Sequence, residues 1–221
     1  MADHKKKKKK TRKNSNYKPT VKYAPIDAVL RKALCDYRST PLEETDMFRS
    51  RETADNKYEK SLEFCLKAGI ITAEEKEKLF DGKRGEVMAF EEVAEFTGLP
   101  VNMTKKNIIS YKAGACDDDA LADQYKQALC DIINEIISEF GPEPDETADE
   151  PLLEAAACYI NFCMENQLIS QDQAISVYVN VKQRENVTME VLAEDVGLSN
   201  AQVEAIMKLR EAAKKAGRPG L

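Results

Sequence analysis

Residues 121–140 read LADQYKQALCDIINEIISEF, and this stretch decides the fold of the chain. Its apolar residues recur three and four positions apart for about five helical turns, until Gly141-Pro142 ends the pattern. The residues that share this spacing are Leu121, Tyr125, Leu129, Ile132, Ile133, Ile136, Ile137 and Phe140. The periodicity predicts one long amphipathic helix.

A short motif inside this helix occurs twice in the sequence. Ala128-Leu129-Cys130-Asp131 repeats Ala33-Leu34-Cys35-Asp36 at an offset of 95 residues. Three further matches follow in the same order, at offsets of 94, 98 and 99. They pair Glu52-Thr53-Ala54-Asp55 with Glu146-Thr147-Ala148-Asp149, Phe64-Cys65 with Phe162-Cys163, and Val93-Ala94-Glu95 with Leu192-Ala193-Glu194. Four collinear matches predict a tandem duplication of a unit of about 90 residues.

Each copy is predicted to consist of helices. After the first helix, a second is expected near 55–68 and 150–166, and a third begins at a sequence with the form of a capping box, Thr72-x-x-Glu75 or Ser170-x-x-Gln173. Only residues 177–181 are a candidate strand, and one short strand cannot build a sheet. We therefore expect an all-α protein with two homologous helical units, 23–115 and 117–217. The matched cysteines should be buried.

Charge is distributed unevenly along the chain, which has 33 Lys and Arg against 39 Asp and Glu. Residues 1–22 carry ten Lys and Arg against Asp3, a net charge of +9, which leaves −15 on the other 199 residues. Because like charges repel, we expect residues 1–22 to form a disordered basic tail suited to polyanions. RNA, DNA and an acidic protein surface, including its own body, are the possible partners, and a tail that only aids solubility is the alternative.

Several enzyme classes are excluded by the residues that the chain lacks. The one histidine, His4, lies in the basic tail, which removes histidine-dependent nucleophile pairs and zinc sites with histidine ligands. No phosphate-binding or dinucleotide-binding glycine motif and no nucleophile-elbow motif is present, and Asp117 to Asp119 fit the first turn of a helix. We expect no enzymatic activity, no cofactor and no bound metal.

The cysteines and the apolar runs predict the compartment. The six cysteines are Cys35, Cys65, Cys116, Cys130, Cys158 and Cys163, and no two have the C-x-x-C spacing of a metal or redox motif. Buried, reduced thiols are expected of a chain in a reducing compartment. No apolar run approaches the roughly 20 residues that cross a bilayer, and no apolar segment follows the lysines at the amino terminus. We expect a soluble, cytoplasmic protein with no membrane partner.

The end of each unit carries the candidate functional site. In the second unit, Thr188 can cap a helix, Gly197-Leu198 forms a turn, and Ser199-x-x-Gln202 opens another helix that continues to about Lys215. This stretch resembles the helix-turn-helix of bacterial transcription regulators and the last DNA-reading region of sigma factors, over about 22 residues. The resemblance implies a transcription-regulating protein that binds double-stranded DNA, with RNA polymerase or another protein as a further partner.

The first unit carries a weaker version of this corner. Gly98-Leu99 aligns with Gly197-Leu198 of the second unit. However, Pro100 takes the place of the capping Ser199, and the polar Thr104 takes the place of the apolar Val203. The exposed polar residues of both corners are suited to phosphates and base edges. The candidate DNA-binding residues are Asn102, Lys105, Lys106, Asn107 and Lys112 in the first unit, and Asn200, Gln202, Lys208, Arg210, Lys214 and Lys215 in the second.

An alternative function remains open, because a helix, a glycine turn and another helix also form the ordinary corners of helical bundles. The net charge of −15 on the body favours a helical protein–protein interaction or structural adaptor of bacterial, phage or mobile-element type, whose tail binds nucleic acid or an acidic partner. A positive stripe from Lys105 and Lys106 to Lys208 and Arg210 would favour DNA. Oligomeric state is also open, since a tandem pair can act as its own pseudo-dimer.

Overall fold

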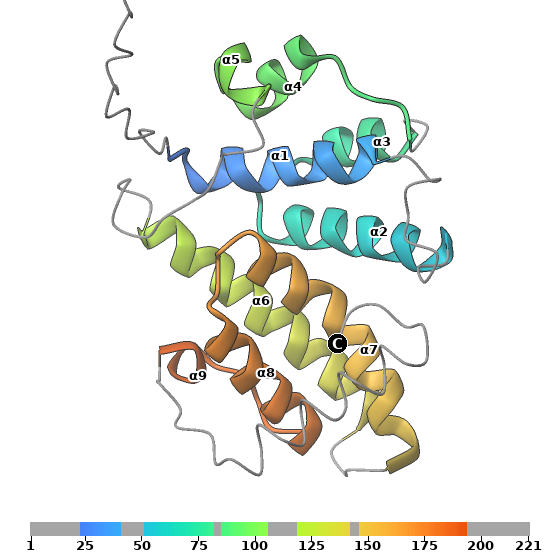
Figure 1. Cartoon of the computed structure of the whole chain (residues 1–221). Helices are drawn as coiled ribbons and strands as arrows, with labels where there is room; N and C mark the ends of the chain where they lie inside the picture. The colour runs from blue at the N-terminus through green and yellow to red at the C-terminus, as the bar shows by residue number, and fades with distance from the viewer. Residues whose placement is uncertain (1–22, 41–50, 82–84, 106–118, 142–145, 194–221) are drawn as a thin grey trace, which may run out of the picture.

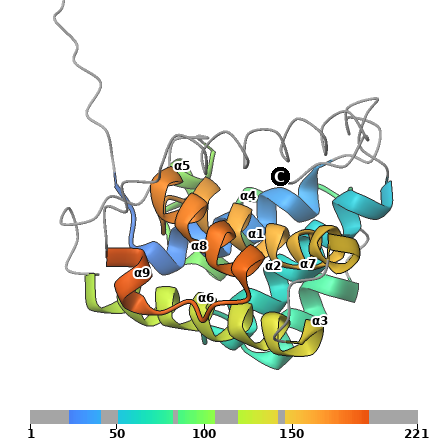
Figure 2. The same ribbon diagram turned by 90° about the horizontal axis from the view of Figure 1, so that it is seen from below.

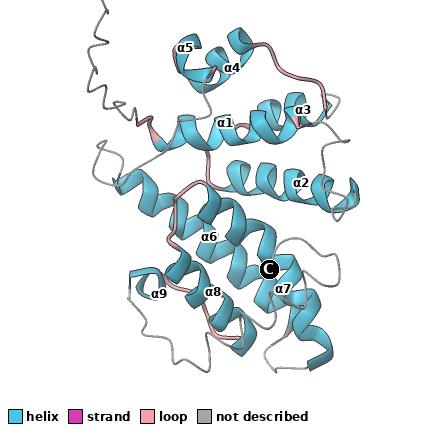
Figure 3. Ribbon diagram, viewed as in Figure 1, coloured by secondary structure: helices cyan, strands magenta, loops and turns pink. Residues whose placement is uncertain are grey.

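The computed structural model of the chain describes residues 23–40, 51–81, 85–105, 119–141 and 146–193 (Figure 1). These ranges contain helices and no β-strand, which confirms the all-α class predicted from the sequence (Figure 3). The helices of the first half are α1 (Ile26–Ser39), α2 (Arg51–Lys67), α3 (Ala73–Asp81), α4 (Phe90–Thr97) and α5 (Val101–Thr104). Those of the second half are α6 (Asp119–Phe140), α7 (Glu146–Glu165), α8 (Gln171–Gln183) and α9 (Met189–Ala193).

Two details differ from the sequence-based expectation. The candidate strand 177–181 lies inside α8, where Val177 and Val181, four residues apart, are both fully buried. Ala174 is buried as well, and the spacing of three and then four residues among Ala174, Val177 and Val181 matches a helix and not the alternation of a strand. In addition, α2 and α7 each begin four residues before the predicted start. Both begin at matched acidic segments, which are favourable in the first turn of a helix.

Hydrogen bonds at corresponding positions occur in the two halves. After α2, the Ile70 N–H donates to the Cys65 carbonyl at 2.8 Å, and after α7 the Leu168 N–H donates to the Cys163 carbonyl at 2.9 Å. The residue before each donor, Gly69 or Gln167, has a left-handed backbone with φ of 76° or 61°. The chain therefore turns in the same way from the second helix to the third in both halves.

The capping boxes predicted at Thr72 and Ser170 are confirmed, and the one predicted at Ser199 lies outside the described residues. The Glu75 N–H donates to Thr72 Oγ1 at 3.2 Å, and the Thr72 N–H donates to Glu75 Oε2 at 2.8 Å. The Gln173 N–H donates to Ser170 Oγ at 3.1 Å, and the Ser170 N–H donates to Gln173 Oε1 at 2.8 Å. Local hydrogen bonds thus fix the starts of α3 and α8.

The two halves share one hydrophobic core. Helix α2 packs against α1 on one side and against α7 on the other, and α2 and α7 lie next to each other in both views (Figures 1 and 2). The rings of Phe64 and Phe162 meet edge to face between these helices, with centroids 5.6 Å apart. The matched cysteines Cys35, Cys65, Cys130 and Cys163 are all buried, as predicted, and all except Cys35 belong to this core. No helix within the described ranges has the length and hydropathy to span a bilayer.

Candidate nucleic-acid interface

The corner between α4 and α5 is the part of the candidate interface that the structure describes. Helix α4 ends at Thr97, the next residue Gly98 has a φ of 69°, and α5 begins directly after Pro100. Only glycine adopts this left-handed conformation without a steric cost, so Gly98 sets the direction in which α5 leaves. Val93 and Leu99 are buried inside the corner. The glycine turn and the small apolar core that the sequence predicts for this corner are therefore both present.

The polar Thr104 fits into this corner because its hydroxyl proton has carbonyl acceptors. Thr104 is 5% exposed, and its Oγ1 lies 2.8 Å from the Val101 carbonyl oxygen and 3.3 Å from that of Phe90. The second of these contacts ties the end of α5 to the start of α4. A buried hydroxyl costs little when it has a hydrogen-bond partner. The threonine therefore does not weaken the corner, contrary to what its polarity suggests.

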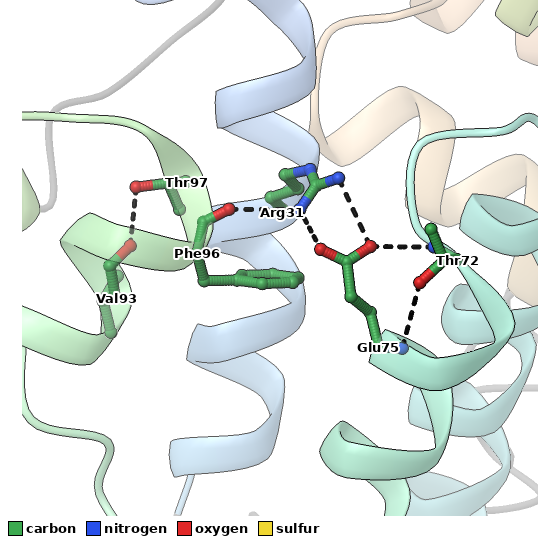
Figure 4. Close-up of polar contacts among 6 residues, drawn as sticks. All are labelled: Arg31, Thr72, Glu75, Val93, Phe96 and Thr97. Carbon is green, nitrogen blue, oxygen red and sulfur yellow. Dashed lines mark hydrogen bonds and ion pairs between the residues drawn. The ribbon is translucent and has the colours of Figure 1, made fainter.

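A charged contact holds the corner on the rest of the first half. Arg31 of α1 donates from Nη1 to Glu75 Oε1 at 2.8 Å and to the Phe96 carbonyl oxygen at 3.1 Å. The guanidinium also lies 4.8 Å from the centroid of the Phe96 ring. Figure 4 shows Arg31 between the carboxylate of α3 and the last turn of α4. One side chain thus connects three helices.

The electrostatics of Glu75 reflect this contact. Partial burial raises the pKa of Glu75, but the hydrogen bonds from Arg31 and from the Thr72 N–H outweigh it, and the pKa lies below its ordinary value. Sequence reasoning identified Glu75 as a capping residue and missed its bond to Arg31. The two residues are 44 positions apart, and no local pattern relates them.

The structure describes two of the eleven candidate DNA-binding residues. Asn102 and Lys105 are both exposed on the corner. Lys105 Nζ lies 5.4 Å from the centroid of the Phe90 ring, which is itself 47% exposed. The other candidates lie outside the described residues: Lys106, Asn107, Lys112, Asn200, Gln202, Lys208, Arg210, Lys214 and Lys215. The tail 1–22 and the second corner beyond Ala193 also lie outside them.

The described part of the chain is acidic. Its residues include 13 Lys and Arg against 27 Asp and Glu, a net charge of −14. Within 85–105, Lys105 is the one cation, and the four carboxylates of Glu86, Glu91, Glu92 and Glu95 are all exposed. At least seven of the 13 cations pair with carboxylates: Arg31, Lys32, Lys57, Lys60, Lys67, Lys78 and Lys126. This part of the body has little free positive charge for phosphates.

Comparisons with known proteins found no match for this chain. No family model matches the chain. No curated protein and no solved structure matches it either. A functional assignment therefore depends on the geometry and the charge of this chain alone.

Proposed function

We propose that the protein is a non-enzymatic nucleic-acid-binding protein, in which residues 1–22 contact phosphates and the corner α4–α5 reads double-stranded DNA. The observation that carries the proposal is the corner itself, where Gly98 turns the chain and Asn102 and Lys105 are exposed beyond the turn. In helix-turn-helix proteins the residues at this position contact base edges and the nearby backbone. An asparagine amide matches the edge of adenine, and a lysine matches phosphate or guanine.

The basic tail supplies the attraction that the acidic body lacks. Its ten Lys and Arg lead directly into Tyr23 and α1, and α4 packs on α1 (Figure 1). The tail therefore joins the body at the helix that carries the corner. Each phosphate that the tail neutralises releases counterions, which favours binding at low salt.

The proposal includes a tandem duplication with units 23–115 and 117–217. Besides the shared turns and capping boxes, the Met88 N–H donates to Ser39 Oγ at 3.3 Å, and the Val187 N–H donates to Asn134 Oδ1 at 2.8 Å. These two contacts fall at matched positions and tie the start of the fourth helix to the first helix. Two such units give one chain two corners, which suits two DNA half-sites without a partner chain.

The cysteines support a non-enzymatic role in the cytoplasm. All five that the structure describes are free thiols, as expected in a reducing compartment. Burial raises the pKa of Cys35 to about 12 and that of Cys130 to about 11. Their thiolates, the form that acts as a nucleophile, are therefore scarce near neutral pH.

A protein-binding adaptor is the second candidate, and the acidic surface favours it. A net charge of −14 on the described residues repels phosphate and attracts a basic partner. Val87 and Phe90, which are 75% and 47% exposed at the start of the corner, offer apolar contacts to such a partner. In this alternative the tail binds nucleic acid and the body binds RNA polymerase or another protein.

The first experiment measures the affinity of the full chain and of residues 23–221 for mixed-sequence duplex over a range of salt concentrations. Removing the tail should lower affinity for every sequence and leave the melting temperature nearly unchanged, because the lysine-rich tail buries little apolar area. A sloping log K against log salt for residues 23–221 supports phosphate contacts by the body. A flat plot contradicts DNA reading by the corners and favours the adaptor.

Single substitutions then test the corner in the full chain. Lys105→Ala should weaken binding to all sequences and reduce the salt slope by about one unit, whereas Asn102→Ala should relax the preference at one base pair by about 1–3 kcal/mol. The matched control is Lys182→Ala, which removes the same charge from an exposed site at the end of α8. Equal effects of Lys105→Ala and Lys182→Ala would mean that net charge, and not the corner, determines binding.

A further inference from the structure

An open groove lies in the second half, between the first turns of α6 and the turn that joins α7 to α8. Its volume is about 740 Å³. Lys126 of α6 and Gln173 of α8 line its polar side, and Met164 and Ile169 line its apolar side. The groove is therefore suited to a segment that carries both a polar and an apolar side chain.

The corresponding place in the first half is filled by the end of α4. Lys126 matches Arg31 at the offset of 95, and Gln173 matches Glu75 at the offset of 98. Arg31 and Glu75 hold the last turn of α4 through the Phe96 carbonyl and the Phe96 ring (Figure 4). The groove is thus the place that the end of the fourth helix occupies in the other copy.

The fourth helix of the second half begins in the same way but is described only as far as Ala193. The Val187 contact to Asn134 holds its start, and Gln173 Nε2 donates to the Leu192 carbonyl. Residues 194–198 follow directly and match 95–99 at the offset of 99. In this alignment Asp195 takes the place of Phe96.

We infer that the groove is the docking site of this chain's own segment 194–198, with the Asp195 carboxylate bound by Lys126. Between the two halves, the cation and its partner change together: Arg31 and Phe96 in the first half correspond to Lys126 and Asp195 in the second. Arg31 lies against an aromatic ring, as a planar guanidinium can, whereas Lys126 is a compact ammonium that suits a carboxylate. Lys126 Nζ is 3.4 Å from Asp123 and has three donors, so it can bind a second carboxylate.

Apolar burial adds to this pairing. Leu99, at the matched position in the first half, is 7% exposed and belongs to the core. Leu198 takes the same place in the alignment, and Met164 and Ile169 offer it an apolar surface. Docking of 194–198 fixes the direction in which the chain continues from residue 199, and hence the position of the second corner.

A charge-swap cycle in the full chain tests the inference. Amide hydrogen exchange of residues 194–198 and of α9 is measured for Asp195→Lys, Lys126→Asp and the double variant. Each single variant should speed exchange roughly tenfold, and the double variant should restore it to within about threefold of wild type. Asp195→Asn, which removes the charge and keeps the shape, should also speed exchange, but by a smaller factor than Asp195→Lys.

The matched control combines Asp195→Lys with Lys182→Asp, which places the new carboxylate at the end of α8. The inference is overturned if this control restores exchange as well as Lys126→Asp does, or if Asp195→Lys changes nothing. Rescue that depends on protein concentration also overturns it, because the groove then binds a second copy. The inference rests on the proposed correspondence of the two halves, and its readout contains no nucleic acid. A failure here is therefore distinct from a failure of DNA binding.

Discussion

Glu75 and Gln173 hold the same position in their capping boxes but attach the fourth helix in different ways. The Glu75 carboxylate binds Arg31, which reaches the Phe96 carbonyl. The Gln173 amide donates directly to the Leu192 carbonyl. A capping residue needs only a side-chain acceptor, so its remaining atoms are free to make a tertiary contact.

Replacing Glu75 by Gln isolates the charge, because Gln also completes a capping box. We expect Glu75→Gln to lower the free energy of unfolding at pH 7 by about 1 kcal/mol, a usual value for a partly exposed pair. Since the folded state lowers the pKa of Glu75 from 4.5, its contribution is present above pH 4.5 and is lost as the pH falls through the lowered pKa. Urea unfolding at pH 7 and pH 3 should show the difference shrinking in acid.

Glu74→Gln is the control for this experiment. Glu74 lies in the same turn, its side chain is 78% exposed, and it pairs with the exposed Lys78. We expect a much smaller change from this substitution. If Glu75→Gln lowers the free energy of unfolding by the same amount at pH 7 and at pH 3, the effect comes from the shape of the side chain and not from its charge.

Thiol reactivity tests the buried cysteines one by one. Among the five described cysteines, Cys158 is the half-buried one, and it should be the first of the five to react with iodoacetamide at pH 8. Cys65 and Cys163 are fully buried, and burial raises the pKa of both thiols, so we expect them to react at least roughly 100-fold more slowly than in urea. Peptide mass spectrometry gives the order. Equal labelling of Cys65 and Cys158 would contradict the described core.

At the scale of the elements, the turns after α2 and α7 have the same backbone conformation and can be compared directly. Both use a left-handed residue, but one is Gly69 and the other is Gln167. A residue with a Cβ costs about 1 kcal/mol or more in this region, which glycine avoids. The second turn therefore carries conformational strain that the first does not.

Exchanging these residue types should change stability in opposite directions. We expect Gln167→Gly to raise the free energy of unfolding by about 0.5–1 kcal/mol and Gly69→Ala to lower it by about 1 kcal/mol. A Cβ added at Gly69 meets no atom within 4 Å, so that cost is conformational and not steric. Urea unfolding followed by circular dichroism measures both. If Gln167→Gly destabilises instead, contacts of the Gln167 side chain in the groove outweigh its backbone strain.

At the scale of the whole molecule, α2 and α7 join the two halves. Phe64 and Phe162 meet between them, and the Glu165 carboxylate accepts bonds from Lys57 and Tyr37. In addition, the Tyr159 hydroxyl of α7 donates to Glu63 Oε2 of α2 at 2.6 Å. Because these apolar and polar contacts all join the first half to the second, we expect the two halves to unfold together.

Phe162→Ala tests this cooperativity. We expect it to lower the free energy of unfolding by about 3–5 kcal/mol, because Phe162 is fully buried in a core shared by both halves. Phe80→Ala is the control, since Phe80 is 56% exposed and should change stability by less than about 0.5 kcal/mol. Circular dichroism and tyrosine fluorescence should report one coincident transition in urea. Two separate transitions would show that the halves unfold independently.

The sequence by itself determined the helical class, both capping boxes and the burial of the matched cysteines. Each follows from residues within one or two turns of one another, such as the apolar period of 121–140 or the Thr72–Glu75 pair. The same local reasoning treated Val177 to Val181 as a candidate strand, because a short β-branched run fits either period. The candidate residues Asn102 and Lys105 were expected to be exposed, and they are.

Tertiary structure alone decided how these elements are joined. The contact of Arg31 with Glu75 and Phe96 links residues 44 and 65 positions apart, and Phe64 meets Phe162 across the two halves. The Thr104 hydroxyl already has a local acceptor in the Val101 carbonyl, and only packing adds the contact with the Phe90 carbonyl, which ties α5 to α4. Tertiary structure likewise decides that the four carboxylates of 85–105 are exposed. Periodicity and capping are short-range effects that a sequence displays directly, whereas these contacts depend on three-dimensional packing, which brings distant residues together.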